Sequence, residues 1–157
     1  MSTATGLLVV KEITPVIDTA IYAANDVLFV PIEIVNAGRV NGANVVLNGI
    51  AMLDEDDETA FAFDLVFLRS NVSLGTLNGA VNISDANAAE VLGVVKVAAT
   101  DVDDLINNML YFRNGLSLQM QLAATSKSLW VGGILRSATP TFAAATNLKL
   151  KLGITQD

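Results

Sequence analysis

The chain has 157 residues, a net charge of -7, no cysteine and no histidine. This length corresponds to about one domain and can bury a core without disulfides. Without cysteine the chain cannot form a thiolate metal site or use a cysteine nucleophile. Without histidine it lacks the commonest general base and cannot form a serine–histidine–acid triad. The negative charge argues against nucleic acid as a partner, because phosphate binding requires clustered lysine and arginine.

The composition is unusually apolar for a chain without a membrane span. It is 52% hydrophobic with a mean hydropathy of +0.52, but it has no apolar stretch of the roughly 18 residues that a span needs. Obligate interfaces are more apolar than ordinary surface. We therefore expect no membrane association and predict a homo-oligomer or an assembly component.

The first third of the chain predicts strands. Residues 6–14 (GLLVVKEIT) indicate an N-terminal strand or arm. Residues 27–35 contain Pro31, which cannot donate to a strand ladder and so marks an edge, a bulge or a change of sheet. After a turn at 36–42, residues 44–53 (NVVLNGIAML) are apolar on both faces, which is typical of a central strand or of one covered by a neighbour.

Five consecutive acids, Asp54 to Glu58, follow this strand. A calcium loop would need acids spaced around a turn-forming glycine, and this run has none. We interpret the run as the solvated tip of a hairpin that also discourages edge-to-edge aggregation.

Residues 61–67 (FAFDLVF) alternate in polarity and predict a half-buried antiparallel strand. Asp64 faces away from the apolar side chains of this strand, so we expect it to be solvent-facing or salt-bridged. The predicted buried face consists of Phe61, Phe63, Leu65 and Phe67.

Two short helices are predicted next. Residues 84–93 have Ser84 or Asp85 as an N-cap and Gly93 as a stop. Residues 100–108 open with Thr100 and carry an acid three positions later, as in a capping box. Helix capping and the helix dipole then explain the acids Asp101, Asp103 and Asp104. The apolar run 91–99 is predicted, like 44–53, as a central or covered strand.

The last third of the chain again alternates. Residues 116–122 (LSLQMQL) and 148–152 (LKLKL) each have one apolar and one polar face. Between them, residues 126–128 (SKS) predict a turn rather than a serine–lysine dyad, and 129–135 (LWVGGIL) are apolar on both faces, with Trp130 expected in the core.

These patterns predict one fold. About eight to ten strand-like runs without a long helix are typical of an all-β protein. We predict an antiparallel β-sandwich, jelly-roll-like, with one or two short helices. Residues 1–157 form a single domain, with 1–12 as an N-terminal strand or arm.

No ordered catalytic motif stands out. The many carboxylates make any acidic pair uninformative, and the phosphate-loop pattern is absent. Only 6% of residues are aromatic, and they do not cluster as a carbohydrate-stacking platform would. We predict no catalytic, cofactor or metal site and therefore no enzyme. The aromatic residues considered for such a platform are Trp130, Tyr22, Tyr111 and Phe112.

The order of short motifs along nearly the whole chain resembles small virion structural proteins of tailed bacteriophages. Each motif alone is weak, and their order carries the resemblance. An apolar strand follows YAAND, an acidic turn leads into FDLVF, and a helix start, an LWV strand and a TPT turn come later. They fall at Tyr22–Asp26, Leu53–Asp57, Phe63–Phe67, Ile83–Ala88, Leu129–Val131 and Thr139–Thr141.

The resemblance implies a capsid decoration (cement) protein on the outer surface of the virion, or alternatively a phage tail, baseplate or receptor-binding β-module. The implied partners are the major capsid protein and further copies of the chain, with a trimer favoured. We expect the contacts to come from Ser2–Lys11 and from the loops at 36–42 and 136–146, which are irregular and weakly charged.

Overall fold

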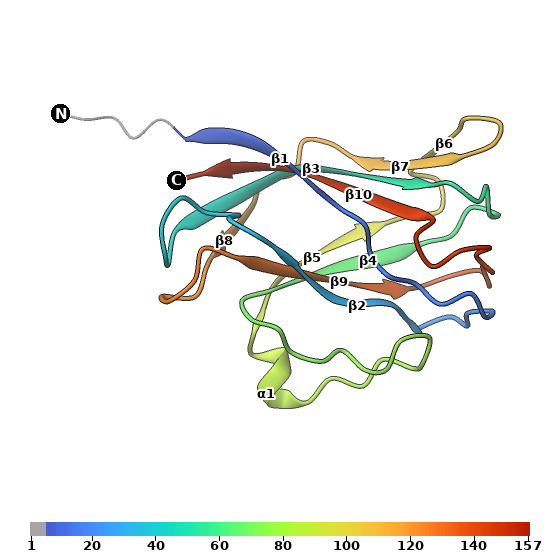
Figure 1. Cartoon of the computed structure of the whole chain (residues 1–157), viewed down its shortest axis with the longest axis horizontal. Helices are drawn as coiled ribbons and strands as arrows, with labels where there is room; N and C mark the ends of the chain where they lie inside the picture. The colour runs from blue at the N-terminus through green and yellow to red at the C-terminus, as the bar shows by residue number, and fades with distance from the viewer. Residues whose placement is uncertain (1–5) are drawn as a thin grey trace.

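The computed structural model describes residues 6–157, which form two antiparallel sheets packed face to face (Figure 1). The first sheet has the strand order β1-β10-β3-β7-β6, with β8 also paired to β3, and the second has the order β2-β9-β4-β5. The elements of the described chain are β1 (Leu7–Ile13), β2 (Val27–Ile34), β3 (Asn44–Asp54), β4 (Phe63–Leu68), α1 (Asp85–Ala88), β5 (Val91–Val97), β6 (Val102–Asp104), β7 (Met109–Arg113), β8 (Leu118–Gln121), β9 (Leu129–Leu135) and β10 (Leu148–Gln156).

The strand pairs are nested. β1 pairs with β10, β2 with β9, β3 with β7 and β8, and β4 with β5, all antiparallel. This pattern is that of one long hairpin rolled up on itself, so β1 to β4 alternate between the two sheets. A double sheet with this winding is a jelly roll, which confirms the predicted fold class.

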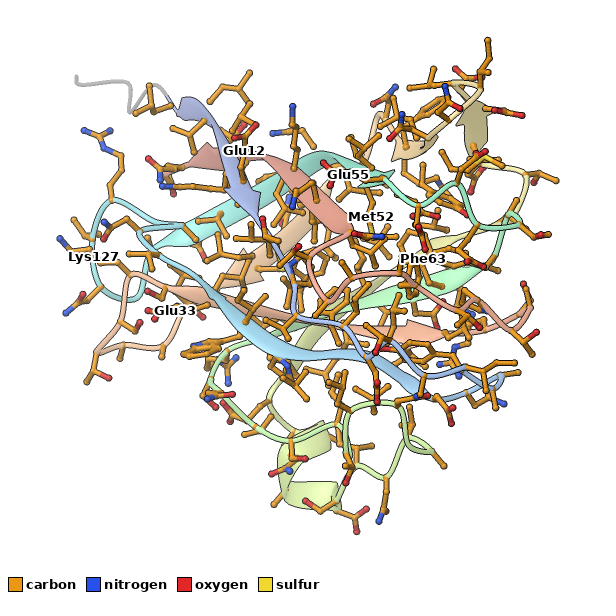
Figure 2. The ribbon with its side chains drawn as sticks, turned by 45° about the vertical axis from the view of Figure 1, so that its right-hand side comes forward. Glu12, Glu33, Met52, Glu55, Phe63 and Lys127 are labelled. Atoms are coloured by element: carbon orange, nitrogen blue, oxygen red, sulfur yellow. The ribbon has the colours of Figure 1, made fainter. Side chains whose placement is uncertain are left out.

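The core lies between the sheets, where Met52 of β3 and Phe63 of β4 project from opposite layers (Figure 2). Its largest members are aromatic, and Phe61 contacts the Tyr111 ring with centroids 5.0 Å apart. The Tyr111 hydroxyl accepts a hydrogen bond from the Phe61 backbone N–H, and the Tyr22 hydroxyl donates one to the Leu28 carbonyl. Burial raises the pKa of each tyrosine to about 12.

The outer face of the second sheet is covered by residues 69–90, which we call the covering segment. This segment connects β4 to β5, carries α1 and runs beneath β2, β9 and β4 in Figure 1. Leu74 is its buried anchor, and it packs with side chains of the sheet in a second apolar cluster. The buried strand residues of that cluster are Val27, Val66, Leu68 and Ile134.

Two adjacent glycines of β9 leave space for large side chains, one on each face of the second sheet. A Cβ on Gly133 would overlap the Phe29 ring in the core, and a Cβ on Gly132 would lie 2.5 Å from the Leu74 side chain of the covering segment. Glycine inside a strand is expected where another group approaches the backbone this closely.

Several expectations for the strands need correction. β4 is buried on both faces, not one, because the covering segment lies against its outward side. β5 is the last strand of its sheet, so it is not central. The alternative of a covered strand holds only in part, because Val91 packs on the outer cluster but Val94 is 44% exposed. The predicted edge or bulge at Pro31 is confirmed, because β2 is an edge strand with register shifts.

The two helix predictions have different outcomes. Ser84 is the N-cap of α1, and its hydroxyl accepts from the Asn87 backbone N–H at 3.2 Å. The helix ends at Ala88, however, and Gly93 belongs to β5, so the predicted stop was wrong. The second helix, at 100–108, does not form, because these residues instead make β6 and the turn that leads to β7.

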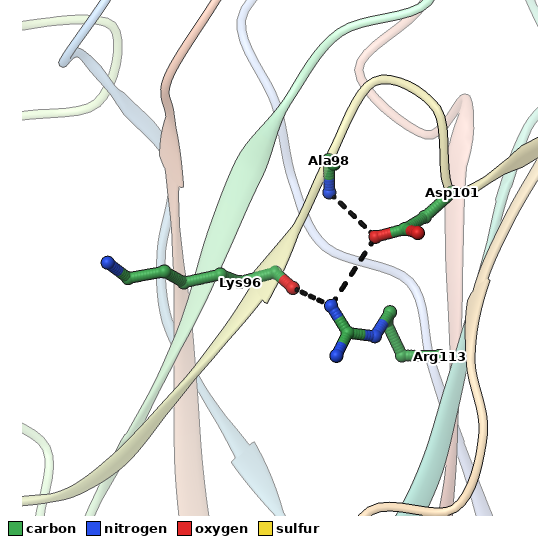
Figure 3. Close-up of polar contacts among 4 residues, drawn as sticks. All are labelled: Lys96, Ala98, Asp101 and Arg113. Carbon is green, nitrogen blue, oxygen red and sulfur yellow. Dashed lines mark hydrogen bonds and ion pairs between the residues drawn. The ribbon is translucent and has the colours of Figure 1, made fainter.

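Asp101, one of the acids assigned to that helix, has another structural role. The Asp101 carboxylate accepts from the Ala98 backbone N–H at 2.9 Å and pairs with Arg113 at 3.4 Å (Figure 3). Arg113 also donates to the Lys96 carbonyl at 2.9 Å. Since Arg113 belongs to β7 and Lys96 to β5, these contacts tie the two sheets together along one side of the sandwich.

Candidate interaction surface

The two sheets differ in whether other residues of the chain cover their outer faces. The covering segment buries apolar side chains of the second sheet, but no segment of residues 6–157 covers the first sheet in the same way. The outer face of the first sheet, which we call the open face, therefore exposes whatever the sequence places there.

Strand register shows which side chains form the open face. One row across the sheet runs Glu12–Lys151–Ala51–Phe112, and the next runs Lys149–Leu53–Leu110–Asp103. Their alternating neighbours, such as Met52 and Leu150, point into the core. The centre of the open face, on β3 and β7, is thus apolar rather than polar.

A groove of about 480 Å³ lies on this apolar centre. Charged side chains flank it and neutralise one another: Lys151 lies 3.3 Å from Glu12, and Lys149 lies 3.7 Å from Glu55. Protein interfaces typically have this arrangement, with an apolar centre and a polar or charged rim. The groove is lined by Glu12, Ile13, Thr14, Ala51, Leu53, Leu105, Leu110, Lys149 and Lys151.

The sequence contained the signal for this surface, although it was not predicted as a contact. Residues 44–53 are apolar on both faces, which indicates a central or covered strand. β3 is central as predicted, but its outward residues Ala51 and Leu53 have no covering element within the described chain.

Two of the predicted contact segments lie together. Within Ser2–Lys11, residues 2–5 lie outside the described residues, and the remainder leads into the edge strand β1. The loop at 36–42 lies beside it, since the Gln156 side chain at the end of β10 donates to the Asn36 and Ala37 carbonyls. A depression of about 440 Å³ joins β1 to this loop.

This depression is basic. Lys11, Arg39 and Lys127 line it, and none of them pairs with a carboxylate of residues 6–157. The sequence scatters these cations over more than one hundred residues, and the fold gathers them.

The third predicted contact segment, 136–146, lies elsewhere. Its backbone pairs with the β1–β2 connection through the Pro140 and Ala145 carbonyls, which accept from the Tyr22 and Ile17 backbone N–H groups. The Ala143 backbone N–H donates to the Asp56 carboxylate at 2.6 Å, so this segment borders the acidic loop. The three predicted segments therefore do not form one surface.

The acidic run itself connects the two sheets instead of closing a hairpin, because β3 lies in the first sheet and β4 in the second. Glu55 and Asp57 are exposed as predicted, but Asp54 is completely buried. Its carboxylate accepts from the Asp56 and Glu58 backbone N–H groups at 2.9 and 3.1 Å and so shapes the turn. Burial raises the Asp54 pKa, and these hydrogen bonds oppose that change only in part.

The remaining candidate positions are structural. Asp64 is buried and forms an ion pair with Arg136 at 2.7 Å, which agrees with the salt-bridged interpretation. Residues 126–128 form a turn in which the Ser126 hydroxyl accepts from the Ser128 backbone N–H. Trp130 is only partly buried, and it packs in the outer cluster beneath the covering segment rather than in the main core.

Within residues 6–157, no group of three or more acidic side chains could hold a metal ion. In the same part of the chain, no helix has the length and apolarity to cross a membrane.

Comparison with known proteins gives little. No family model matches the chain, and no curated protein matches it. Among solved structures, one of desmodium yellow mottle tymovirus is similar with a TM-score of 0.31 and 8% identity, over 99% of this chain and 82% of that one. A TM-score this low supports no conclusion about fold or function, so the jelly roll rests on the strand pairing alone.

Proposed function

We propose that this chain is a non-enzymatic structural protein of a tailed-phage virion, namely a decoration (cement) protein on the outer capsid surface. It binds the major capsid protein as a homo-oligomer, with a trimer favoured, and stabilises the contacts between capsomers. Neither nucleic acid, membrane nor a cofactor takes part in this role.

The observation that carries the proposal is the open face. The chain covers the apolar outside of its second sheet with its own residues and leaves an apolar groove on the outside of its first. An exposed apolar surface with a polar rim marks a site of protein contact. The order of motifs shared with virion structural proteins supports the capsid as the partner.

The rest of the molecule suits this role. A cement protein acts through binding energy, and a two-layer sandwich with a filled core presents a rigid surface that loses little entropy on binding. The net charge of -7 is compatible with an outer position, away from packaged DNA. In this proposal Leu53 and Leu110 are anchors of the interface, since they line the groove.

The deciding experiment has two parts. Quantitative mass spectrometry of purified virions should find this chain in numbers comparable to the major shell protein. Far fewer copies would favour the tail, baseplate or receptor-binding alternative, and absence from the particle would contradict any virion role.

The second part tests the surface. Leu110→Asp should abolish co-sedimentation with capsids that lack the decoration protein, because it places a charge in the groove. Ile21→Asp, at an exposed apolar position on the β1–β2 connection, is the matched control and should bind normally. Circular dichroism confirms that both variants fold. Undiminished binding by folded Leu110→Asp would exclude the groove as the capsid contact.

A further inference from the structure

Besides β8, which pairs with β3 alone, the first sheet has a free edge strand at each end of its strand order within residues 6–157. β1 ends the strand order on one side and β6 on the other, and neither has a further partner strand within residues 6–157. The two edges are four strand spacings apart, about 19 Å, so they cannot satisfy one another within one chain.

The β1 edge is apolar in its first half and carries Lys11 and Glu12 in its second. Leu8 and Val10 are each 65% exposed, and the strand contains neither proline nor a register shift that would discourage pairing. The β2 edge of the second sheet, in contrast, has Pro31 and register shifts. A long apolar edge strand is a template for another chain.

The β6 edge is also apolar at its end. The turn between β6 and β7 exposes Leu105 by 51% and Ile106 by 82%, the highest exposure among the large apolar side chains described. Ile106 has a φ of 79°, a conformation that is costly for a β-branched residue, and the Asp104 carboxylate accepts from its backbone N–H at 2.7 Å. Backbone strain of this kind tends to persist where function requires it.

The two edges carry opposite charge. Lys11 of β1 and its neighbours Arg39 and Lys127 have no carboxylate partner among the described residues. At the other edge, Asp103 and Asp104 of β6 have no cationic partner there either. The remaining charge on β1, Glu12, is already paired with Lys151.

We propose that the occupant of each edge is the opposite edge of a second copy, with the β6 edge and the Leu105–Ile106 turn of one protomer docked on β1 of the next. The contact is head-to-tail, since two different patches meet, and such contacts close into rings when the rotation permits. Asp104, which shares the face of Lys11, then lies against the basic depression. This deepens the homo-oligomer of the proposed function and rests on it.

The test uses the isolated protein and two variants that each damage one edge. Size-exclusion chromatography with light scattering should give a closed trimer for the wild type. Val10→Asp and Ile106→Asp should each be monomeric, because every contact in a ring of identical copies uses both edges. An equal mixture should form dimers, because the intact β1 of Ile106→Asp can accept the intact turn of Val10→Asp.

Each outcome is decisive. A monomeric wild type, or either variant remaining trimeric, would overturn the proposal. A mixture that stays monomeric while both variants show the wild-type circular dichroism spectrum would exclude head-to-tail docking.

If Val10→Asp or Ile106→Asp fails to fold, a charge exchange between the two edges tests the same contact. Lys11→Glu should weaken assembly at least tenfold at low salt, and adding Asp104→Lys in the same chain should restore it, because Lys11 and Asp104 lie on the same face of the sheet. Failure of the double variant to recover would contradict the pairing of these edges. Capsid co-sedimentation is measured separately, so loss of the trimer and loss of the proposed function are distinguishable.

Discussion

Single residues decide how the acidic run should be understood. Five consecutive acids favour a solvated loop, and Glu55 and Asp57 are exposed accordingly. Asp54 differs because it is the last residue of β3 and points inward, where its carboxylate organises the backbone of the turn. Sequence alone could not separate it from its four neighbours, because the position of a strand end cannot be fixed within one or two residues.

The buried Asp54 gives a prediction about pH. Its pKa is raised in the folded protein, so the unfolded chain loses this proton first as the pH rises above about 4. The contribution of Asp54 to the free energy of unfolding is therefore present at low pH and is lost as the pH rises through the folded pKa.

Urea unfolding of the wild type and Asp54→Asn between about pH 4 and pH 7 measures this effect. We expect the stability of the wild type relative to the variant to fall with rising pH, because asparagine does not titrate. A difference that grows with pH would show that the backbone donors outweigh burial.

At the scale of secondary-structure elements, strands with a period-two pattern were predicted more completely than runs that are apolar on both faces. The period-two runs at 116–122 and 148–152 are strands with the predicted buried faces, since alternation directly reports one wet and one dry side. The two-faced runs predicted a covering neighbour without identifying it. For β9 the neighbour is the covering segment, whereas no element of residues 6–157 covers the outward side chains of β3.

The helix predicted at 100–108 shows where local sequence spacing misleads. Its acids fit a capping box by spacing, but the Asp101 carboxylate accepts from the nearby Ala98 backbone N–H and pairs with Arg113 of β7. Tertiary contacts of this kind override local spacing and are not visible in the sequence. The open-face groove was missed for the same reason, because its lining comes from β1, β3, β7 and β10 together.

The covering segment yields a prediction at the scale of elements. Leu74 is its buried anchor over Gly132, so Leu74→Ala should lower the free energy of unfolding by about 2–4 kcal/mol. Val40→Ala, at a side chain 60% exposed, should change it by less than about 0.5 kcal/mol. Chemical denaturation measures both, and a near-neutral Leu74→Ala would show that the segment contributes little to stability.

At the scale of the whole molecule, nested pairing makes the strands unequal. β10 pairs with both β1 and β3 in the first sheet, whereas β1 is the edge strand and pairs with β10 alone. Removal of residues 148–157 should therefore abolish the fold, since it opens the core and separates β1 from the sheet.

Removal of residues 2–11 should leave a folded sandwich, because most β1 side chains are exposed. Circular dichroism and amide hydrogen exchange distinguish the two truncations. A folded chain without 148–157, or an unfolded one without 2–11, would contradict this ranking of the strands. The shorter chain should also fail to form the trimer, because it lacks most of the β1 edge.

The position of β1 beside β10 also has a consequence for biosynthesis. A ribosome makes β1 first and β10 last of the ten described strands, so β1 has no partner while the intervening residues are being made. During that time its apolar side chains are available to every other nascent copy on the same message. Polysomes bring such copies close together, and a cell that produces this protein at high level must keep them apart until β10 arrives.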